Sequence, residues 1–173
     1  MEKKIMTPVT KGLLIALITI VINVIGYMAH IEQASWFRWI STLVMCVGII
    51  WACIHYAQQM DGSVTFGNVF VHGFKVSAVI TVISIIYFAL AITVLFPEMK
   101  DKALETARQK MEEGGKMSEE QINQGLEMTK KFFMPFAIGA ILFGTLIAGA
   151  IASLIGAAVA KKKPANQLDQ FPS

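Results

Sequence analysis

The chain has 173 residues, of which 15 are Lys or Arg and 12 are Asp or Glu. These charges leave four long stretches free, residues 12–31, 39–60, 76–97 and 132–160. A helix needs roughly 20 apolar residues to cross the hydrocarbon core of a bilayer, and every stretch reaches that length. Length, composition and charge therefore exclude a soluble globular domain, a disordered chain and, with only two Cys, a disulfide scaffold.

The charge-free stretches predict an all-α polytopic membrane protein with a bundle of four transmembrane helices. Residues 1–173 form a single membrane domain in this prediction. Its spans cover about 9–29, 37–57, 76–96 and 134–160. Membrane lipid is the expected surrounding. Lys and Arg are scattered over termini and loops and form no basic face, which excludes nucleic acid as a partner.

Two segments carry clear helix-start signals. Thr7 followed by Pro8 predicts the N-terminus of the first helix, since Thr caps well and Pro is tolerated at the first helical position. Thr65 can cap a helix whose aromatic stripe would lie in the membrane interface before the third span. That stripe consists of Phe66, Phe70 and Phe74. A ligand or lipid-headgroup role for Asn68, His72 and Lys75 is the weaker alternative.

The polar segment 98–131 predicts an amphipathic αα-hairpin between the third and fourth spans. Ser118 and Gln121 form a capping box, and Met117 with Ile122 forms a hydrophobic staple. Apolar side chains recur along both helices as matching seams, which makes them candidate partner-binding residues. They are Met99, Leu104, Met111, Ile122 and Leu126. The hairpin is expected to stand upright, and lying flat on the membrane is the alternative.

A ridge of small residues runs along the fourth span with a spacing of four. It consists of Ala140, Gly144, Ala148, Ala152, Gly156 and Ala160. Small residues allow two helices to approach closely, which is a main source of helix association in lipid. We expect this ridge to pack within the chain, with a homodimer seam as the alternative.

Chemistry-bearing side chains are sparse in the spans. A charge at a helix centre costs about 2.5–3.5 kcal/mol on insertion scales, and no predicted span has one there. Asn23, Thr81 and Ser84 are the candidate polar intramembrane residues. The chain shows no motif of a nucleophile, phosphate loop or zinc site. We predict no catalytic residues, no cofactor and no metal, with a site of His55, Asp61 and His72 as a remote alternative.

Four segments together resemble a known family. They are Val64–Lys75, Phe96-Pro97-Glu98, Gly115–Ile122 and Ser153–Lys163. In order and spacing they are similar to a Bacteroidota family of small four-span membrane proteins, domain of unknown function 4199. The resemblance covers nearly the whole chain and implies an inner-membrane location and a four-helix core. It implies no activity, catalytic residues or cofactor.

Orientation is read from the Lys residues next to the spans. Both termini carry an excess of Lys next to a span, namely Lys3, Lys4, Lys161, Lys162 and Lys163, with Glu2 as the one acid beside them. The positive-inside rule therefore favours cytoplasmic N- and C-termini, with Lys11 and Lys75 on the same side. The sequence indicates a non-enzymatic inner-membrane protein that uses the hairpin as an interaction or scaffold element, with a protein partner or a homo-oligomer possible. A homo-oligomeric channel or small-solute facilitator is the alternative.

Overall fold

The computed structural model describes residues 6–31, 34–114 and 118–161, and within these the chain is helical without strands. The helices are α1 (Pro8–Met28), α2 (Ser35–Gln59), α3 (Phe66–Leu90), the π-helix η1 (Ala91–Leu95), α4 (Glu98–Glu113) and α5 (Glu119–Val159). Four segments of the described chain are long and apolar enough to cross a membrane: Pro8–Met28, Trp39–Gln59, Phe66–Leu95 and Glu119–Val159. The all-α prediction with four membrane-spanning helices is confirmed.

Local sequence signals fix several helix ends. Thr7 caps α1 by accepting a hydrogen bond from Thr10 N at 3.2 Å, as predicted. Thr65 likewise accepts from Asn68 N at 3.2 Å and caps α3. Between α2 and α3 the chain reverses at Asp61 and Gly62, which have φ angles of 50° and 76°. Glycine is the residue best suited to this left-handed backbone.

The aromatic segment before the third span is not a separate interfacial helix. Phe66, Phe70 and Phe74 belong to the same α3 that continues to Leu90. No Gly-Pro pair or capping residue interrupts the chain between Phe74 and the apolar run that follows, so the backbone hydrogen bonding continues. Lys75 is exposed on this helix, and a long Lys side chain can carry its charge away from an apolar surface. The predicted separate helix is therefore wrong, although the predicted cap is confirmed.

The hairpin's second helix and the fourth span are one helix. α5 runs for 41 residues and contains Pro135 in its interior. A proline inside a helix removes one backbone hydrogen bond, so α5 lacks one of its backbone hydrogen bonds at Pro135. Pro97, by contrast, lies between two helices, after η1 and before α4.

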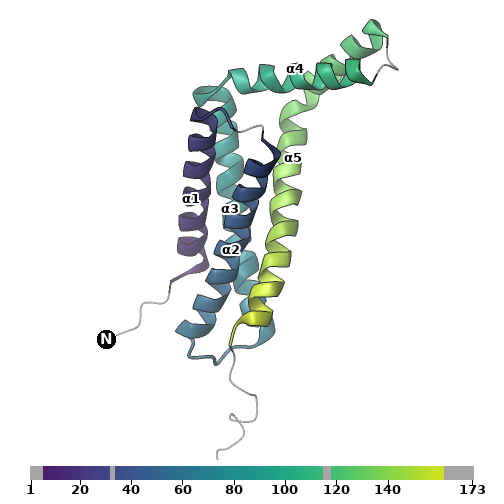
Figure 1. The fold of residues 1–173 in the computed structure, drawn as a ribbon. Coiled ribbons are helices and arrows are strands. Elements are labelled where there is room, and N and C mark those ends of the chain that lie inside the picture. Colours follow the sequence, from purple (N-terminus) through teal and green to yellow (C-terminus); the bar gives the residue numbers. More distant parts are fainter. Residues whose placement is uncertain (1–5, 32–33, 115–117, 162–173) are drawn as a thin grey trace, which may run out of the picture. The chain divides into compact units, whose positions relative to one another are not determined.

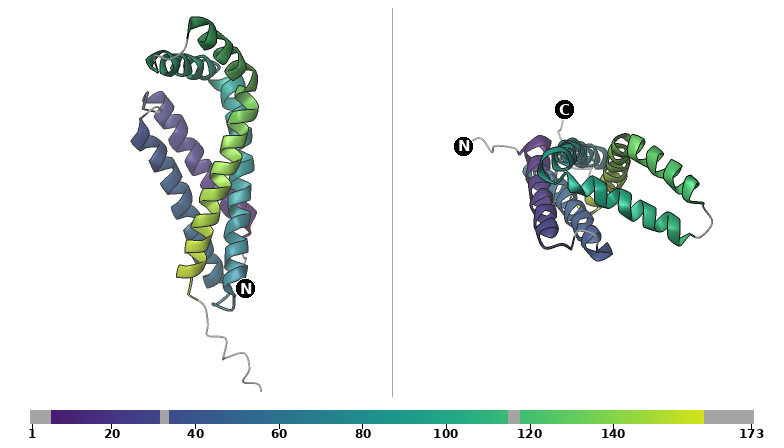
Figure 2. Two further views of the ribbon diagram at one scale, coloured as in Figure 1. Left: turned by 90° about the vertical axis from the view of Figure 1, so that its right-hand side faces the viewer. Right: turned by 90° about the horizontal axis from the view of Figure 1, so that it is seen from above.

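The chain divides into two compact units, each described separately below. The first, which we call the bundle unit, comprises Met1–Ser84 and Gly144–Ser173. In it α1, α2, the first part of α3 and the last part of α5 lie side by side and alternate in direction (Figures 1 and 2). Its core is drawn from all four helices and contains Ile15, Ile49, Cys53, Val69, Val76, Ile80, Ala152 and Ala157.

The second unit, Ile85–Phe143, contains the end of α3, η1, α4 and the first part of α5. We call α4, Ser118 and residues 119–131 of α5 the hairpin. The right-hand view of Figure 2 shows these two segments running next to each other. Ser118 and Gln121 make the predicted capping box, with Ser118 N donating to Gln121 Oε1 at 3.0 Å and Gln121 N donating to Ser118 Oγ at 3.4 Å. Met117, the other half of the expected staple, lies outside the described residues.

Candidate functional site

The most unusual side chain of the bundle unit is Lys11. It is the fourth residue of α1 and has an exposed fraction of 0 %. Lysine is almost never fully buried unless its charge is paired. Its ammonium reaches across two other helices, donating to Ala52 O at 3.2 Å, to Gln59 Oε1 at 3.3 Å and to His72 Nε2 at 3.3 Å. All three donors of the ammonium are thus used.

The Tyr56 ring lies beside these groups, and we call Lys11, Tyr56, Gln59 and His72 the polar cluster. The Tyr56 ring lies 5.9 Å from Lys11 Nζ and stacks on the His72 imidazole with 4.1 Å between the ring centroids. Because an ammonium can only donate, His72 must accept at Nε2, which assigns the proton of the neutral imidazole to Nδ1. The contacts fix both the position and the tautomer of His72.

None of the described contacts of Lys11 is with a carboxylate. Its acceptors are a backbone carbonyl, an amide and an imidazole, all of them neutral. Burying a cation is costly, and removing one of its partners costs more than replacing the ion by an apolar group. The polar cluster therefore joins α1, α2 and α3 at one end of the bundle unit, and from here on we call it the clasp.

Sequence reasoning missed this clasp because it treated Lys11 as a charge flanking the first span. One signal pointed to it: the Thr7 cap already places Lys11 inside α1, four residues before the buried Ile15 and therefore on the same face. His72 lies in the cluster, whereas Lys75 is exposed. Among the described residues, no group of three or more His, Cys, Asp or Glu could hold a metal ion.

Polar residues expected inside the membrane mostly bond to their own or a neighbouring helix. Asn23 Nδ2 donates to Thr19 O at 2.8 Å, one turn earlier on α1. Thr81 Oγ1 donates to Ser77 O at 2.9 Å and lies 2.8 Å from Thr145 Oγ1 on α5. Ser84 is half-buried on α3. These bonds satisfy the side chains within single helices and across the α3–α5 contact, so they leave fewer polar groups to line a conduit.

The small-residue ridge of α5 and its buried face coincide only in part. Ala152, Gly156 and Ala160 are buried and Ala148 is half-buried, whereas Ala140 and Gly144 are exposed. A Cβ added at Gly144 would meet nothing within 4 Å, so the close approach expected there is not found. Within the ridge the tight contact lies at Gly156, where an added Cβ would collide with Cys53 on α2. A second tight contact lies at Gly149, where an added Cβ would collide with Ser77 on α3, a position that a strict spacing of four overlooked.

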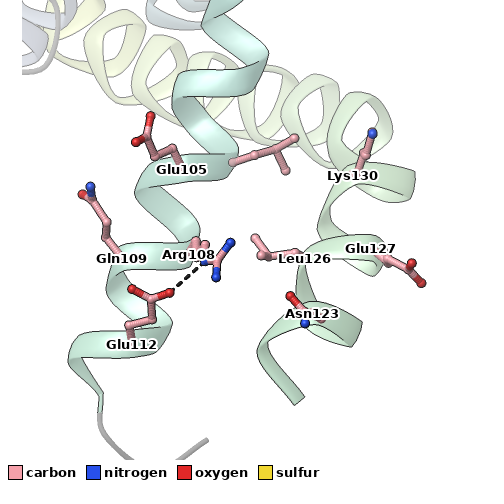
Figure 3. A pocket seen from close by; sticks show the side chains of 9 residues that line it. Glu105, Arg108, Gln109, Glu112, Asn123, Leu126, Glu127 and Lys130 are labelled. Carbon is pink, nitrogen blue, oxygen red and sulfur yellow. Dashed lines mark hydrogen bonds and ion pairs between the residues drawn. The ribbon is translucent and has the colours of Figure 1, made fainter. Parts of the chain in front are cut away.

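The candidate partner-binding residues all lie in the second unit. Ile122 is buried, and Met99, Leu104, Met111 and Leu126 are half-buried. A groove of about 920 Å³ opens between α4 and the first part of α5. It is lined by Leu104, Glu105, Arg108, Gln109, Glu112, Asn123, Leu126, Glu127 and Lys130. Figure 3 shows Arg108 and Leu126 pointing toward each other from its two walls.

One ion pair lies on the α4 wall of this groove. Arg108 Nε donates to Glu112 Oε1 at 2.8 Å, one helical turn further along. This hydrogen bond raises the pKa of the Arg108 guanidinium, which therefore stays charged under all ordinary conditions. Since both side chains are about half exposed, the pair adds little stability.

Comparison with known proteins gives a family and no activity. The family model described as "Protein of unknown function (DUF4199)" matches residues 10–162. No curated protein and no solved structure matches the chain.

Proposed function

Because the chain belongs to the family described as "Protein of unknown function (DUF4199)", its role has to be argued from geometry, and we propose that it is a non-enzymatic membrane protein whose hairpin binds a protein partner. The bundle unit then serves as the membrane base. The hairpin is the recognition element, and the groove between its helices receives the partner.

The observation that carries this proposal is the incomplete packing of the hairpin. α4 has 16 residues, and none of them is buried. An isolated helix of about 12–15 residues is marginal in water, and most helical stability in proteins comes from packing an apolar face. The capping box and the apolar seams nevertheless specify the shape of the hairpin. The apolar seams of the hairpin thus have a defined shape but stay half-buried, and such a surface suits a binding partner.

The alternative of a homo-oligomeric channel receives less support. A conduit needs polar groups that face a path, and Asn23 and Thr81 use their side chains for hydrogen bonds within the bundle unit. Lys11, the one fully buried cation among the described residues of the bundle unit, has all its donors occupied.

We further propose that the protein lies in the inner membrane of a bacterium, with cytoplasmic termini and an extracytoplasmic hairpin. Lys161 adjoins the end of α5, and the remaining Lys of the terminal clusters lie outside the described residues. Ser118→Cys should react with a membrane-impermeant thiol reagent in cells with a permeabilised outer membrane, while Ala165→Cys should stay unlabelled. Labelling of Ala165→Cys alone would reverse the orientation.

Replacing residues 99–130 with a flexible Gly/Ser linker of equal length tests the function. The variant should insert into the membrane in normal amounts and lose the partner that co-purifies with the wild-type chain in mild detergent. Cells carrying it should show the phenotype of a null strain. A linker variant that behaves like wild type, combined with a null phenotype for Asn23→Leu or Thr81→Val, would favour the channel instead.

A further inference from the structure

A second groove lies in the bundle unit, along the boundary between the neighbouring helices α1 and α2 (Figures 1 and 2). It has a volume of about 590 Å³ and is lined by Leu14, Ile15, Ile18, Leu43, Val44, Val47, Gly48 and Trp51. The two helices meet at its floor, because a Cβ added at Gly48 would lie only 3.0 Å from the Ile15 side chain. Ligand sites in proteins have volumes of about 300–1,000 Å³, so this groove is large enough to hold a ligand.

The surroundings of the α1–α2 groove decide the class of its ligand. All its lining residues belong to the membrane-spanning segments Pro8–Met28 and Trp39–Gln59, and none of them carries a charge. Several are exposed and therefore meet the hydrocarbon of the bilayer, namely Leu14, Ile18, Leu43, Val47 and Trp51. A water-soluble ligand would have to cross lipid to reach them, whereas an acyl chain is already present.

The length of the groove matches one leaflet of the bilayer. Its lining on α2 runs from Leu43 to Trp51, which at about 1.5 Å per residue is roughly 12 Å. One leaflet contributes about 15 Å to a hydrocarbon core that is about 30 Å thick. The groove therefore has the length of a single acyl chain, and the polar end of that chain would lie beyond Trp51, toward the end of α2 at Gln59.

A polar side chain without a partner lies at this end of the groove. The half-buried His55 imidazole stacks on the Trp51 ring with 5.2 Å between the ring centroids. Its Nδ1 atom is buried and has no hydrogen-bond partner among the residues that the structure describes, which leaves Nε2 as the nitrogen that can reach a ligand. A neutral imidazole that carries its proton on Nε2 can donate to a phosphate oxygen.

Charge in the same region favours a negative group. Lys11, one turn before Leu14 and Ile15, donates to Ala52 O, the carbonyl of the residue after Trp51. No carboxylate is among the described contacts of this ammonium, so a phosphate beside His55 would supply a negative charge at short range. An apolar helix packed into the groove would leave both the His55 imidazole and the Lys11 charge as they are.

We infer that the α1–α2 groove binds one phospholipid from the leaflet on the clasp side, with an acyl chain in the groove and the phosphate beside His55. The hairpin takes no part in this site. The inference therefore goes beyond the proposed function and can fail without it.

The first test counts the lipids that the full chain retains in mild detergent, by native mass spectrometry. Wild type should retain one added phosphatidylglycerol per chain and about tenfold less diacylglycerol, which has the same acyl chains without the phosphate. Val47→Phe fills the groove and should lower retention of phosphatidylglycerol by about tenfold. Val82→Phe is the matched control, since Val82 is a similarly exposed valine of a span in the bundle unit and does not line the groove. That variant should retain phosphatidylglycerol like wild type.

His55→Phe tests the polar end of the site separately. Phe keeps an aromatic ring against Trp51 but has no hydrogen-bond donor. This variant should therefore retain phosphatidylglycerol no better than diacylglycerol. An unchanged preference for phosphatidylglycerol would overturn the placement of the phosphate beside His55.

The second test uses wild type in lipid nanodiscs and does not depend on a substitution. A phospholipid with a photoactivatable group in its acyl chain should label the α1 and α2 peptides that line the groove several-fold more than the α3 peptide around Val82. Equal labelling of all four spans, equal retention of the two lipids by wild type, or equal losses for Val47→Phe and Val82→Phe would each overturn the lipid site. A dimeric chain whose groove stays unlabelled would assign the groove to a second copy instead.

Discussion

At the scale of single residues, the clasp around Lys11 ties three helices together through one ammonium. Its contacts with Ala52 O, Gln59 Oε1 and His72 Nε2 come from α2 and α3. Hydrogen bonds to charged groups contribute about 1.5–3 kcal/mol each, and a buried charge that loses a partner is strongly destabilising. The clasp is thus asymmetric: removing an acceptor should harm the protein more than removing the cation.

His72→Leu should therefore lower the apparent unfolding temperature in detergent by several degrees. The lost hydrogen bond is worth about 1.5–3 kcal/mol, and in a chain of this size each kcal/mol shifts the unfolding temperature by roughly 2–4 °C. Lys11→Met should cost less, because it removes the buried charge together with the bonds. The double variant Lys11→Met/His72→Leu should be more stable than His72→Leu alone. Strictly additive losses would contradict the clasp.

Lys75→Met is the control for this series. Lys75 lies one turn after His72 on α3 and is exposed, so the change removes a lysine of the same region without breaking the clasp. Its effect should stay within about 0.5 kcal/mol, as for ordinary surface substitutions.

At the scale of elements, helix packing in the bundle unit depends on where two backbones come closest. At Gly149 an added Cβ would collide with Ser77, whereas Gly144 faces open space. Gly149→Ala should destabilise the bundle by about 1–3 kcal/mol through overpacking. Gly144→Ala should be neutral or slightly stabilising, because Ala favours a helix by about 0.5–1 kcal/mol over Gly.

Thermal unfolding of both variants in the same detergent checks this pair. Ser77→Gly should relieve Gly149→Ala, since it removes the side chain that the new methyl group meets. Equal destabilisation by Gly144→Ala and Gly149→Ala would contradict the assignment of the close helix contact to Gly149 rather than Gly144.

The start of α5 offers a second prediction at this scale. Ser118→Ala removes one half of the capping box, and loss of such a cap costs about 0.5–2 kcal/mol. The bundle unit does not contain this cap, so the loss should be local. Amide hydrogen exchange should accelerate at residues 119–122 and stay unchanged in α1 and α2. Unchanged exchange at the start of α5 would show that the box does not hold the helix end.

Helix ends could be predicted from the sequence because their causes are local. Thr7, Thr65 and Ser118 each bond to a backbone N–H three residues away, and this spacing is visible in the chain itself. The burial of Lys11 has a different origin, since its partners are 41, 48 and 61 residues away. Long-range packing decides which helices meet and with which faces. The positions of charge-free stretches in the sequence do not predict this packing. For the same reason the close contact at Gly149 was missed and the open side of Gly144 was not foreseen.

At the scale of the whole molecule, the buried core is divided unevenly between the two units. The bundle unit contains the clasp and the buried core of Ile49, Cys53, Val76 and Ile80. The hairpin contributes Ile122 alone to the buried hydrophobic residues that the structure describes. Helices in lipid associate through van der Waals packing and interhelical hydrogen bonds, and the described contacts of both kinds are concentrated in the bundle unit.

Replacing residues 99–130 with the Gly/Ser linker should therefore leave the bundle unit folded, because every contact of the clasp and nearly all of the described core lie outside the replaced segment. The apparent unfolding temperature of the variant should remain within a few degrees of wild type. His72→Leu should lower it by the same amount in the linker variant as in the full chain, since distant and independent sites contribute additively. Thermal unfolding of the four proteins in one detergent measures both effects. A linker variant that unfolds much earlier, or in which His72→Leu has no further effect, would show that the hairpin helps to hold the bundle and that its role is structural rather than recognition.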